Sequence, residues 1–416
     1  MKKIIIIGGG TVFHVRNHLA LCAPAYGNAA RFLYSYGKEY CSQENDYNFE
    51  LFLTKMANQG NGNLETNQDI SCLVDKLILD KEVKMIIFNP ALCDYTGAIN
   101  NLHGKYSDRL KTSQGEQLLS LYPDDKIIAK IRKDRKDIFL VAFKTTCGAT
   151  EDEQFVAGLS LLKKNSCNLV LANDTKTRVN MVITPEQARY GVSTNREEAL
   201  KLLFEMSLSR SKGTFTRSTV KDGESISWNS SKIPSNLREV VNFCINNKAY
   251  KAFNGATVGH FAVKIDDQNF ITSKRKVDFN NLQEVGMVHC QVIDDDTVIA
   301  YGAKPSVGGQ SQRIIFKDHP NMDAIVHFHC PPKHGMNKLL SVKEQKYNEC
   351  GSHQCGKNTS AGLVDVGISN IKCVYLDNHG PNIVFNKDTN PKLVIDFIKN
   401  TFDLSKSTDG LLNERI

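Results

Sequence analysis

No apolar run in the 416 residues is long enough to cross a membrane, and no internal repeat or low-complexity segment is found. At the start, the four isoleucines of "MKKIIIIGGG" are too few for the apolar core of a secretion signal, so we expect a buried first strand. The content of 41% hydrophobic and 23% charged residues is typical of a globular chain. These features exclude a fibrous, disordered or membrane-spanning protein and favour a cytoplasmic one.

The twelve cysteines are scattered and form no spaced disulfide framework, so we interpret them as free thiols in a reducing cytoplasm. The closest pair, Cys350 and Cys355, lacks the usual spacing of zinc ligands. The net charge of +7 is spread over runs such as "KIIAKIRKDRKD", which are typical of solvated helix faces. This charge fits small anionic ligands. The sequence has no basic stripe with interleaved aromatic residues, so it does not indicate binding of nucleic acid.

Two kinds of pattern divide the chain. Up to about residue 226, apolar runs such as "KIIIIGGG", "VKMIIFNPA" and "CNLVLAND" alternate with helical stretches, which predicts a parallel sheet buried on both faces. Beyond "SISWNSSKIPSNLR", a helix and short alternating strands predict a mostly antiparallel sheet covered by helices. We therefore expect an α/β protein with a Rossmann-like domain over residues 1–228 and an α/β/α domain over residues 236–416.

Two histidines one residue apart end the apolar run "MDAIVHFHCPP". Strand alternation places His327 and His329 on one face, whereas Val326, Phe328 and Cys330 take the other. Two imidazoles so close can chelate a metal, although an ordinary polar strand face gives the same pattern.

A third histidine, His379, follows about fifty residues later beside Gly380, where a strand is expected to end. Three histidines make the ligand count that leaves a zinc coordination position open. The pattern therefore favours a metal centre over a plain polar face.

Five motifs of this half follow one another: "GHFAVKIDDQNFITS", "KPSVGGQ", "HPNMDAIVHFHCP", "CGKNTSAGLVD" and "DNHG". In these motifs and their order this half of the chain resembles the class II aldolase/adducin family over residues 236 to about 400. The resemblance implies a carbon–carbon lyase that binds Zn²⁺ through His327, His329 and His379 and acts on a small phosphorylated or acidic metabolite. Ser273 and Ser306 take positions that touch the substrate phosphate in the family.

Two positions depart from that family. Gly308 stands where the family has the glutamate that handles the proton, and the nearby Gln310 cannot act as a base. His260 replaces an asparagine of the first hairpin, where it could bind phosphate, act as a base or pack as an ordinary core histidine. A non-catalytic, adducin-like interaction domain is therefore an alternative.

Six motifs follow one another over residues 1 to about 215: "GGGT", "VRNH", "NPALCDY", "RLKTSQGEQL", "LVAFKTT" and "LLKKNSCNLVLAND". In these motifs and their order the N-terminal half resembles the phosphopantothenoylcysteine synthetase family, the C-terminal domain of the DNA/pantothenate metabolism flavoproteins. That family activates a carboxylate with a nucleoside triphosphate, and the amine of cysteine then attacks the acyl-nucleotide. The cofactor expected here is CTP or ATP with Mg²⁺.

The resemblance implies roles for particular residues of the N-terminal half. Asn17 falls on the catalytic asparagine, which steadies the acyl-nucleotide. The positions that fall on nucleotide-binding residues are Gly8, Gly9, Gly10, Thr11, Ala91, Asp94, Phe143, Lys163 and Lys164. A tight turn for the glycines, a core position for Phe143 and a solvated helix end for the two lysines are the structural alternatives.

Two departures from that family leave the identity of the acid substrate undetermined. The apolar "LALCAPAYG" replaces a short Ser-Gly-rich loop, and "TKTRVNMVITPEQARYG" replaces a segment that closes on the substrate. We predict a two-domain metabolic enzyme, ligase-like and lyase-like, that acts on small molecules and forms a homo-oligomer, with a tetramer through the C-terminal domain as first choice. The alternative is a lyase whose N-terminal half is a non-catalytic nucleotide-binding scaffold.

Overall fold

The computed structural model describes residues 1–44, 46–253 and 255–408. It divides into two compact units: unit 1 comprises Met1–Pro185 and Gly191–Ser211, and unit 2 comprises Glu186–Tyr190 and the chain from Lys212 onward. Residues 212–228, which the sequence analysis assigned to the first domain, belong to unit 2 because a strand in this segment pairs within the second sheet. The last residues of the predicted second domain, 409–416, lie outside the described residues. Among the described residues, no helix has the length and apolar content needed to span a membrane.

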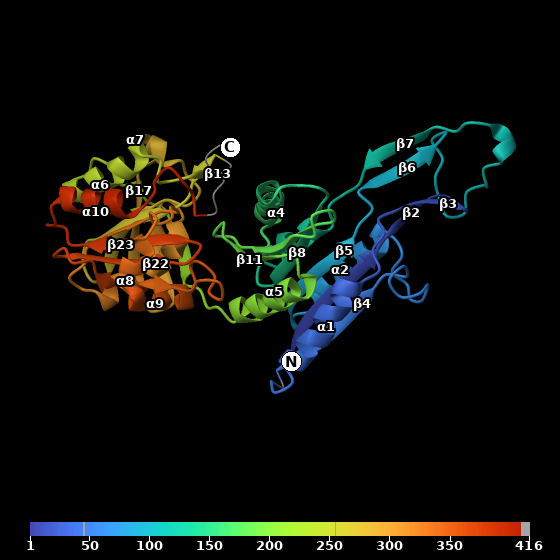
Figure 1. The fold of residues 1–416 in the computed structure, drawn as a ribbon, viewed down its shortest axis with the longest axis horizontal. Helices are drawn as coiled ribbons and strands as arrows, with labels where there is room; N and C mark the ends of the chain where they lie inside the picture. The colour runs from blue at the N-terminus through green and yellow to red at the C-terminus, as the bar shows by residue number, and fades with distance from the viewer. Residues whose placement is uncertain (45, 254, 409–416) are drawn as a thin grey trace. The chain divides into compact units, whose positions relative to one another are not determined.

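Unit 1 is built on a seven-stranded sheet (Figure 1). The strand order is β11 (Arg189–Ser193), β10 (Asn180–Ile183), β9 (Leu169–Asp174), β8 (Phe139–Thr146), β5 (Val83–Ala91), β1 (Lys2–Gly10) and β4 (Tyr47–Leu53). The strands from β9 to β4 are parallel, and β10 is antiparallel to β9. Residues 4–7 of β1 are each at most 1% exposed, so helices cover both faces of the sheet. The predicted parallel sheet is confirmed.

The helices of unit 1 form two groups. The first group contains α1 (Asn28–Tyr40) and α5 (Arg196–Ser211), which pack against each other; the second contains α2 (Asn67–Leu79), α3 (Ile128–Asp134) and α4 (Glu151–Asn165). In the first group, the rings of Tyr36 and Phe204 meet edge to face at 5.9 Å. Helices thus lie between the apolar runs that form the strands, as the sequence predicts.

Two hairpins continue the chain beyond the carboxyl ends of β1 and β5. They are β2 (Val12–Arg16) with β3 (Leu19–Cys22), and β6 (Tyr95–Ile99) with β7 (Leu119–Pro123). The segment between β6 and β7 contains the short 3-10 helix η1 (Thr112–Gln114). Figure 1 shows β6, β7 and this segment projecting from the rest of unit 1. We call residues 12–22 and 95–123 the arm.

Unit 2 is built on a ten-stranded sheet. Its order is β12 (Arg217–Lys221), β18 (Thr297–Tyr301), β17 (Met287–Val292), β16 (Asn269–Ser273), β15 (His260–Lys264), β19 (Ala324–His327), β23 (Gly380–Phe385), β22 (Ile371–Leu376) and β20 (Val342–Lys343), with β21 (Val364–Asp365) also beside β22. The strands from β18 to β22 are antiparallel, and β12 and β20 pair in parallel at the two edges. A short hairpin, β13 (Ala252–Phe253) with β14 (Ala256–Thr257), stands apart.

Helices cover both faces of this sheet. On one face pack α6 (Ser235–Asn246) and α10 (Pro391–Thr401), and on the other α8 (Gln310–Asp318) and α9 (His353–Gly362); α7 (Leu282–Val285) is a single turn before β17. Alternation along β15 divides the core, because Phe261 and Val263 join the cluster under α6 and α10 while Ala262 joins the one under α8. The predicted α/β/α architecture with a mostly antiparallel sheet is confirmed.

Candidate functional site

The three histidines predicted to bind metal converge at one end of the unit 2 sheet. Their ligand nitrogens all lie within 4.8 Å of one another. The ring centroids of His327 and His329 are 5.0 Å apart, and the ring of His379 lies 4.8 Å from the first and 4.6 Å from the second. No more than 8% of any of the three residues is exposed. We call these three residues the histidine triad.

The chain around the triad follows the predicted alternation. The strand β19 ends at His327, two residues before the predicted end at His329, yet His329 still returns to the same side. Val326, Phe328 and Cys330 all lie in the apolar core under α6 and α10. The core side chains therefore hold the extended segment so that both histidines face away from the apolar cluster.

Glycines on the two neighbouring strands allow the backbone to pass very close to the end of β19. A Cβ atom on Gly380, whose φ is +147°, would lie 2.1 Å from the carbonyl oxygen of Phe328. A Cβ atom on Gly259, whose φ is +116°, would lie 2.5 Å from the carbonyl oxygen of His327. Only glycine fits at such distances, and the approach of Gly380 carries His379 to the other two rings.

A backbone hydrogen bond sets the tautomer of His327. Its Nδ1 atom lies 2.7 Å from the carbonyl oxygen of Pro381, which can only accept, so Nδ1 carries the proton and Nε2 keeps its lone pair. Burial lowers the pKa of His327 to about 4, although the bond to Pro381 acts in the opposite direction. The ring is therefore neutral at pH 7, in the form that binds a metal.

The chemistry of the triad fits zinc. Among the described residues, the group consists of three histidines with no thiolate or carboxylate. Three imidazole ligands with a fourth position left open are the usual set of a catalytic zinc site, with zinc-to-nitrogen bonds of about 2.1 Å.

The predicted substrate residues Ser273 and Ser306 are brought together. Ser273 ends β16, and Ser306 begins the short 3-10 helix η3 (Ser306–Gly309). The two hydroxyl oxygens are 3.2 Å apart, and both side chains are buried. Because β15 and β16 are antiparallel, Ser273 and Ser306 lie at the same end of the sheet as His260. The side-chain surroundings of Gly308 and Gln310 lie outside the described part of the structure.

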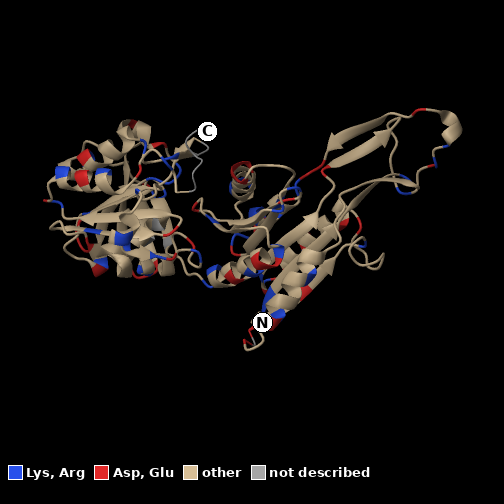
Figure 2. Ribbon diagram, viewed as in Figure 1, with Lys and Arg blue, Asp and Glu red and all other residues tan. Residues whose placement is uncertain are grey.

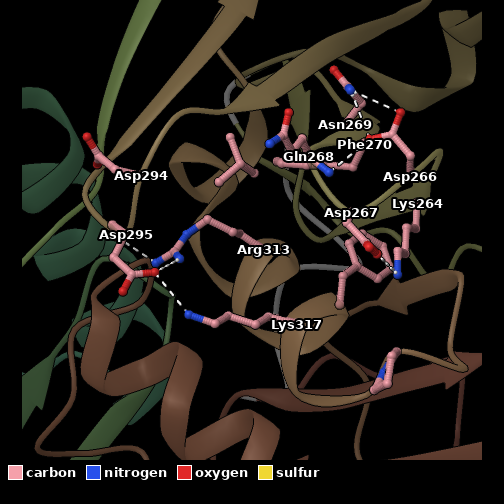
Figure 3. A pocket seen from close by; sticks show the side chains of 13 residues that line it. Lys264, Asp266, Asp267, Gln268, Asn269, Phe270, Asp294, Asp295, Arg313 and Lys317 are labelled. Atoms are coloured by element: carbon pink, nitrogen blue, oxygen red, sulfur yellow. Dashed lines mark hydrogen bonds and ion pairs between the residues drawn. The ribbon is translucent and has the colours of Figure 1, made fainter.

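A cavity of about 440 Å³ lies at the opposite end of β15 and β16 (Figure 3). It is lined by Lys264, the last residue of β15, and by Arg313 and Lys317 of α8. Arg313 and Lys317 both form ion pairs with Asp295, at 3.0 and 3.2 Å. The strand β15, which runs from the triad end of the sheet to the cavity, spans about 13 Å. We therefore do not count the cavity as part of the metal site.

In unit 1, the glycines predicted to bind nucleotide lie at the end of a strand. Residues 8–10 are the last residues of β1 and do not form a loop. The N–H of Gly10 donates to the carbonyl of Ala25 at 2.7 Å, and the N–H of Thr11 donates to that of Ala91 at 3.0 Å. These two amides are therefore paired within the chain, and nucleotide binding by residues 8–11 stays a prediction.

The other predicted residues of unit 1 lie on separate elements. Asn17 is exposed in the turn between β2 and β3, and the guanidinium of Arg196 lies 5.9 Å from the centre of the Phe143 ring on β8. Lys163 and Lys164 end α4, where the Lys163 ammonium donates to the carbonyl of Pro185. Asp94 follows β5 and forms an ion pair with Lys126. Within the predicted set, Gly10 lies opposite Ala91 in the β1–β5 ladder, and Thr11 donates to the carbonyl of Ala91.

A cavity of about 890 Å³ in unit 1 contains residues that the sequence analysis did not select. Lys126, Lys130 and Lys133 line it at helical spacing, in a run whose charge pattern predicts a solvated helix face. Asn67, the first residue of α2, links Thr11 to Asp124 through hydrogen bonds of 2.6 and 2.7 Å. The spacing of the lysines was the available signal, but the sequence does not show which surface that helix face meets.

Unit 2 is thus an α/β/α domain with a buried three-histidine centre, and unit 1 is a parallel-sheet domain with a basic cavity. Residues 238–386 match the family model described as the Class II Aldolase and Adducin N-terminal domain, which confirms that part of the sequence prediction. A comparison with curated protein sequences finds no match.

Solved structures of both predicted groups are similar to the chain. The DNA/pantothenate metabolism flavoprotein from Streptococcus pneumoniae is 20% identical, with 49% of this chain and 97% of that one covered and a TM-score of 0.41. The C-terminal domain of the coenzyme A biosynthesis bifunctional protein CoaBC is 15% identical, with 50% and 94% covered and a TM-score of 0.36. An L-fuculose 1-phosphate aldolase is 16% identical, with 41% and 85% covered and a TM-score of 0.30.

We predict that Gly380→Ala destabilises unit 2 and lowers its metal content. The new methyl group would meet the Phe328 carbonyl oxygen, so we expect a loss of about 3 kcal/mol or more in the free energy of unfolding, measured with denaturant. The matched control is Gly367→Ala, where φ is +77° and the added atom meets nothing within 4 Å; only backbone strain of about 1 kcal/mol is expected there. Equal losses in the two variants would contradict the role given to the close approach.

Proposed function

We propose that the chain is a two-domain metabolic enzyme in which unit 2 is a zinc-dependent lyase of the class II aldolase type. The observation that carries the proposal is the buried histidine triad, which lies within the residues that match the family model. When bound, zinc would supply Lewis-acid chemistry toward the oxygen atoms of a carbonyl substrate. The substrate class that fits is a small phosphorylated or acidic hydroxycarbonyl compound.

The side chains around the triad have distinct roles in this proposal. The bond from His327 to the Pro381 carbonyl orients the imidazole, and all three rings are buried. The paired hydroxyls of Ser273 and Ser306 can turn to donate to an anionic group of the substrate. Gly308 supplies no carboxylate, so the proton acceptor of this enzyme differs from the glutamate of the resembled family.

For unit 1 we propose activation of a small acid by CTP or ATP with Mg²⁺. The support is the basic cavity beyond the carboxyl ends of β1 and β5, the edge at which open parallel sheets bind ligands. Lys105, Lys126 and Lys130 line it and can stabilise the charge of a phosphorylated acid. The exposed Asn17 amide, on the neighbouring hairpin, is the group proposed to steady the acyl-nucleotide.

The proposed metal centre predicts one tightly bound zinc ion per chain. His329→Ala removes one of three ligands, so we expect its zinc content after purification and dialysis, measured by mass spectrometry of metals, to fall at least tenfold. The control His334→Ala changes an exposed histidine nearby in the sequence and should keep the wild-type content. Equal zinc content in wild type and His329→Ala would exclude the assignment and favour a non-catalytic interaction domain.

The proposed ligase site predicts that Asn17→Ala separates binding from chemistry. We expect calorimetry to give unchanged affinity for CTP or ATP with Mg²⁺, because the amide acts on the intermediate, while pyrophosphate release with phosphopantothenate as the trial acid falls by at least a hundredfold. His18→Ala, an exposed neighbour in the same turn, is the control and should change neither quantity. Absence of binding by every triphosphate would leave unit 1 as a scaffold.

We also propose that the chain forms a homo-oligomer, in which unit 1 pairs with a second copy through the arm. Several large apolar side chains of the arm are exposed, among them Leu118, Leu119, Leu121 and Tyr122. The side chains of Leu119, Leu121 and Leu21 of β3 gather around Gly97, where a Cβ atom would meet each of them. A soluble chain seldom leaves such a face uncovered, and a second copy carries the same face for a symmetric contact.

Light scattering tests this assembly. We expect a multiple of the single-chain mass of 46.5 kDa for the wild type and a smaller assembly for Leu121→Asp, which places a charge on the apolar face. The control is Leu79→Asp at the end of α2, because Leu79 is even more exposed but lies outside the arm. A wild-type protein of single-chain mass would contradict the proposal.

A further inference from the structure

His260 lies directly beside the histidine triad without being part of it. It faces His327 across the β15–β19 ladder, and the centroids of the two rings are 4.9 Å apart. Only 4% of the residue is exposed. Among the described residues, the group of possible metal ligands nevertheless contains the triad alone. The question is therefore what the ring of His260 presents to the space around the triad.

The side chain of Gln312 determines which nitrogen of the His260 ring carries the proton. This residue of α8 is completely buried, and its Nε2 atom lies 3.2 Å from Nδ1 of His260 and 3.4 Å from Oγ1 of Thr272. The Thr272 hydroxyl donates its hydrogen to the carbonyl of Phe261 at 3.1 Å, so toward Gln312 it can only accept.

These contacts set the orientation of the amide. An amide NH₂ has two hydrogens and can serve both Nδ1 of His260 and Oγ1 of Thr272. The flipped amide would place its oxygen against the Thr272 hydroxyl, which can only accept. It would also leave two buried N–H groups without a partner, whereas the present orientation leaves only the amide oxygen without a partner among the described residues. Nε2 therefore faces His260.

The orientation of Gln312 in turn sets the tautomer of His260. Because Nδ1 accepts a hydrogen bond, a neutral ring must carry its proton on Nε2. A ring whose Nδ1 lone pair accepts this hydrogen bond cannot be doubly protonated, so the ring of His260 is neutral. A protonated Nε2 cannot coordinate a metal, but it can donate a hydrogen bond, and no described residue accepts one from it.

We propose that His260 is a hydrogen-bond donor of the metal site, held in its Nε2–H form by Gln312, and that it binds an oxygen atom of the substrate beside the metal. This inference rests on the function proposed for unit 2. It favours a substrate with two adjacent oxygen atoms, such as a hydroxycarbonyl compound or its deprotonated form, one oxygen for the metal and one for His260. Gln312 is the positioning residue, and His260 touches the substrate.

The first test reads the tautomer in the metal-free, full-length protein by long-range ¹H–¹⁵N correlation after labelling of histidine. The His260 signals are identified by their loss in His260→Asn. We expect the proton on Nε2, both before and after zinc is added. In Gln312→Glu the carboxylate accepts from the ring, so the proton should move to Nδ1. Gln345→Glu is the control, because Gln345 is equally buried but contacts Asn348 and Cys355, and it should leave the His260 signals unchanged.

The second test measures binding of acetohydroxamate, which offers two adjacent oxygen atoms, to the zinc-loaded protein. His260→Phe keeps a ring but has no donor, so we expect unchanged zinc content and roughly tenfold weaker binding of the probe, the effect of one hydrogen bond to a charged group. His260→Asn restores an amide donor and should recover most of the affinity.

Several results would overturn the inference. They are a proton on Nδ1 in the wild type, a change of the His260 signals to those of a metal ligand when zinc is added, or equal affinity of wild type and His260→Phe for acetohydroxamate. Failure of the proposed function is distinguishable, because a protein that binds no zinc would refute the metal site and the substrate role while the tautomer of the metal-free ring is still observed.

Discussion

The close approach of three strands at the end of β19 is the constraint on which the candidate metal centre depends. Gly259 and Gly380 flank the residues 327–329, and at both glycines a side chain would collide with a backbone carbonyl. The three histidines come from two segments about fifty residues apart, and this approach makes them one cluster. The apolar core behind Phe328 then holds the segment in place, so packing energy supports the geometry of the site.

Burial also sets the chemistry of these rings. Removing imidazoles from water disfavours their charged form, and the pKa values of His260 and His327 both fall for this reason. Neutral rings then differ only in which nitrogen carries the proton, and that is decided by a single hydrogen bond to each. The Pro381 carbonyl leaves His327 with a lone pair on Nε2, whereas the Gln312 amide leaves His260 with a hydrogen there. Two adjacent histidines are thereby suited to different tasks, metal ligation and donation.

Much of this arrangement could be predicted from the sequence, and the reasons for the rest are physical. The alternation of Val326, Phe328 and Cys330 with the two histidines is a local property of an extended chain, so it was predicted correctly. The buried parallel sheet of unit 1 followed from continuous apolar runs. The pairing of the Gly10 and Thr11 amides could not be predicted, because the carbonyls that accept from them come from other parts of the chain. Gln312 and the lysines of α3 were missed because their roles depend on which side chains lie opposite after folding.

The central claim is that three buried histidines of unit 2 hold one zinc ion with an open position. X-ray absorption at the zinc edge of the purified, full-length protein tests it most directly, because this measurement reads the ligand atoms and their distances. The account predicts three nitrogen ligands and one oxygen ligand at about 2.0–2.1 Å, with no sulfur. A first shell that contains sulfur at about 2.3 Å, or fewer than three histidine nitrogens, would contradict it.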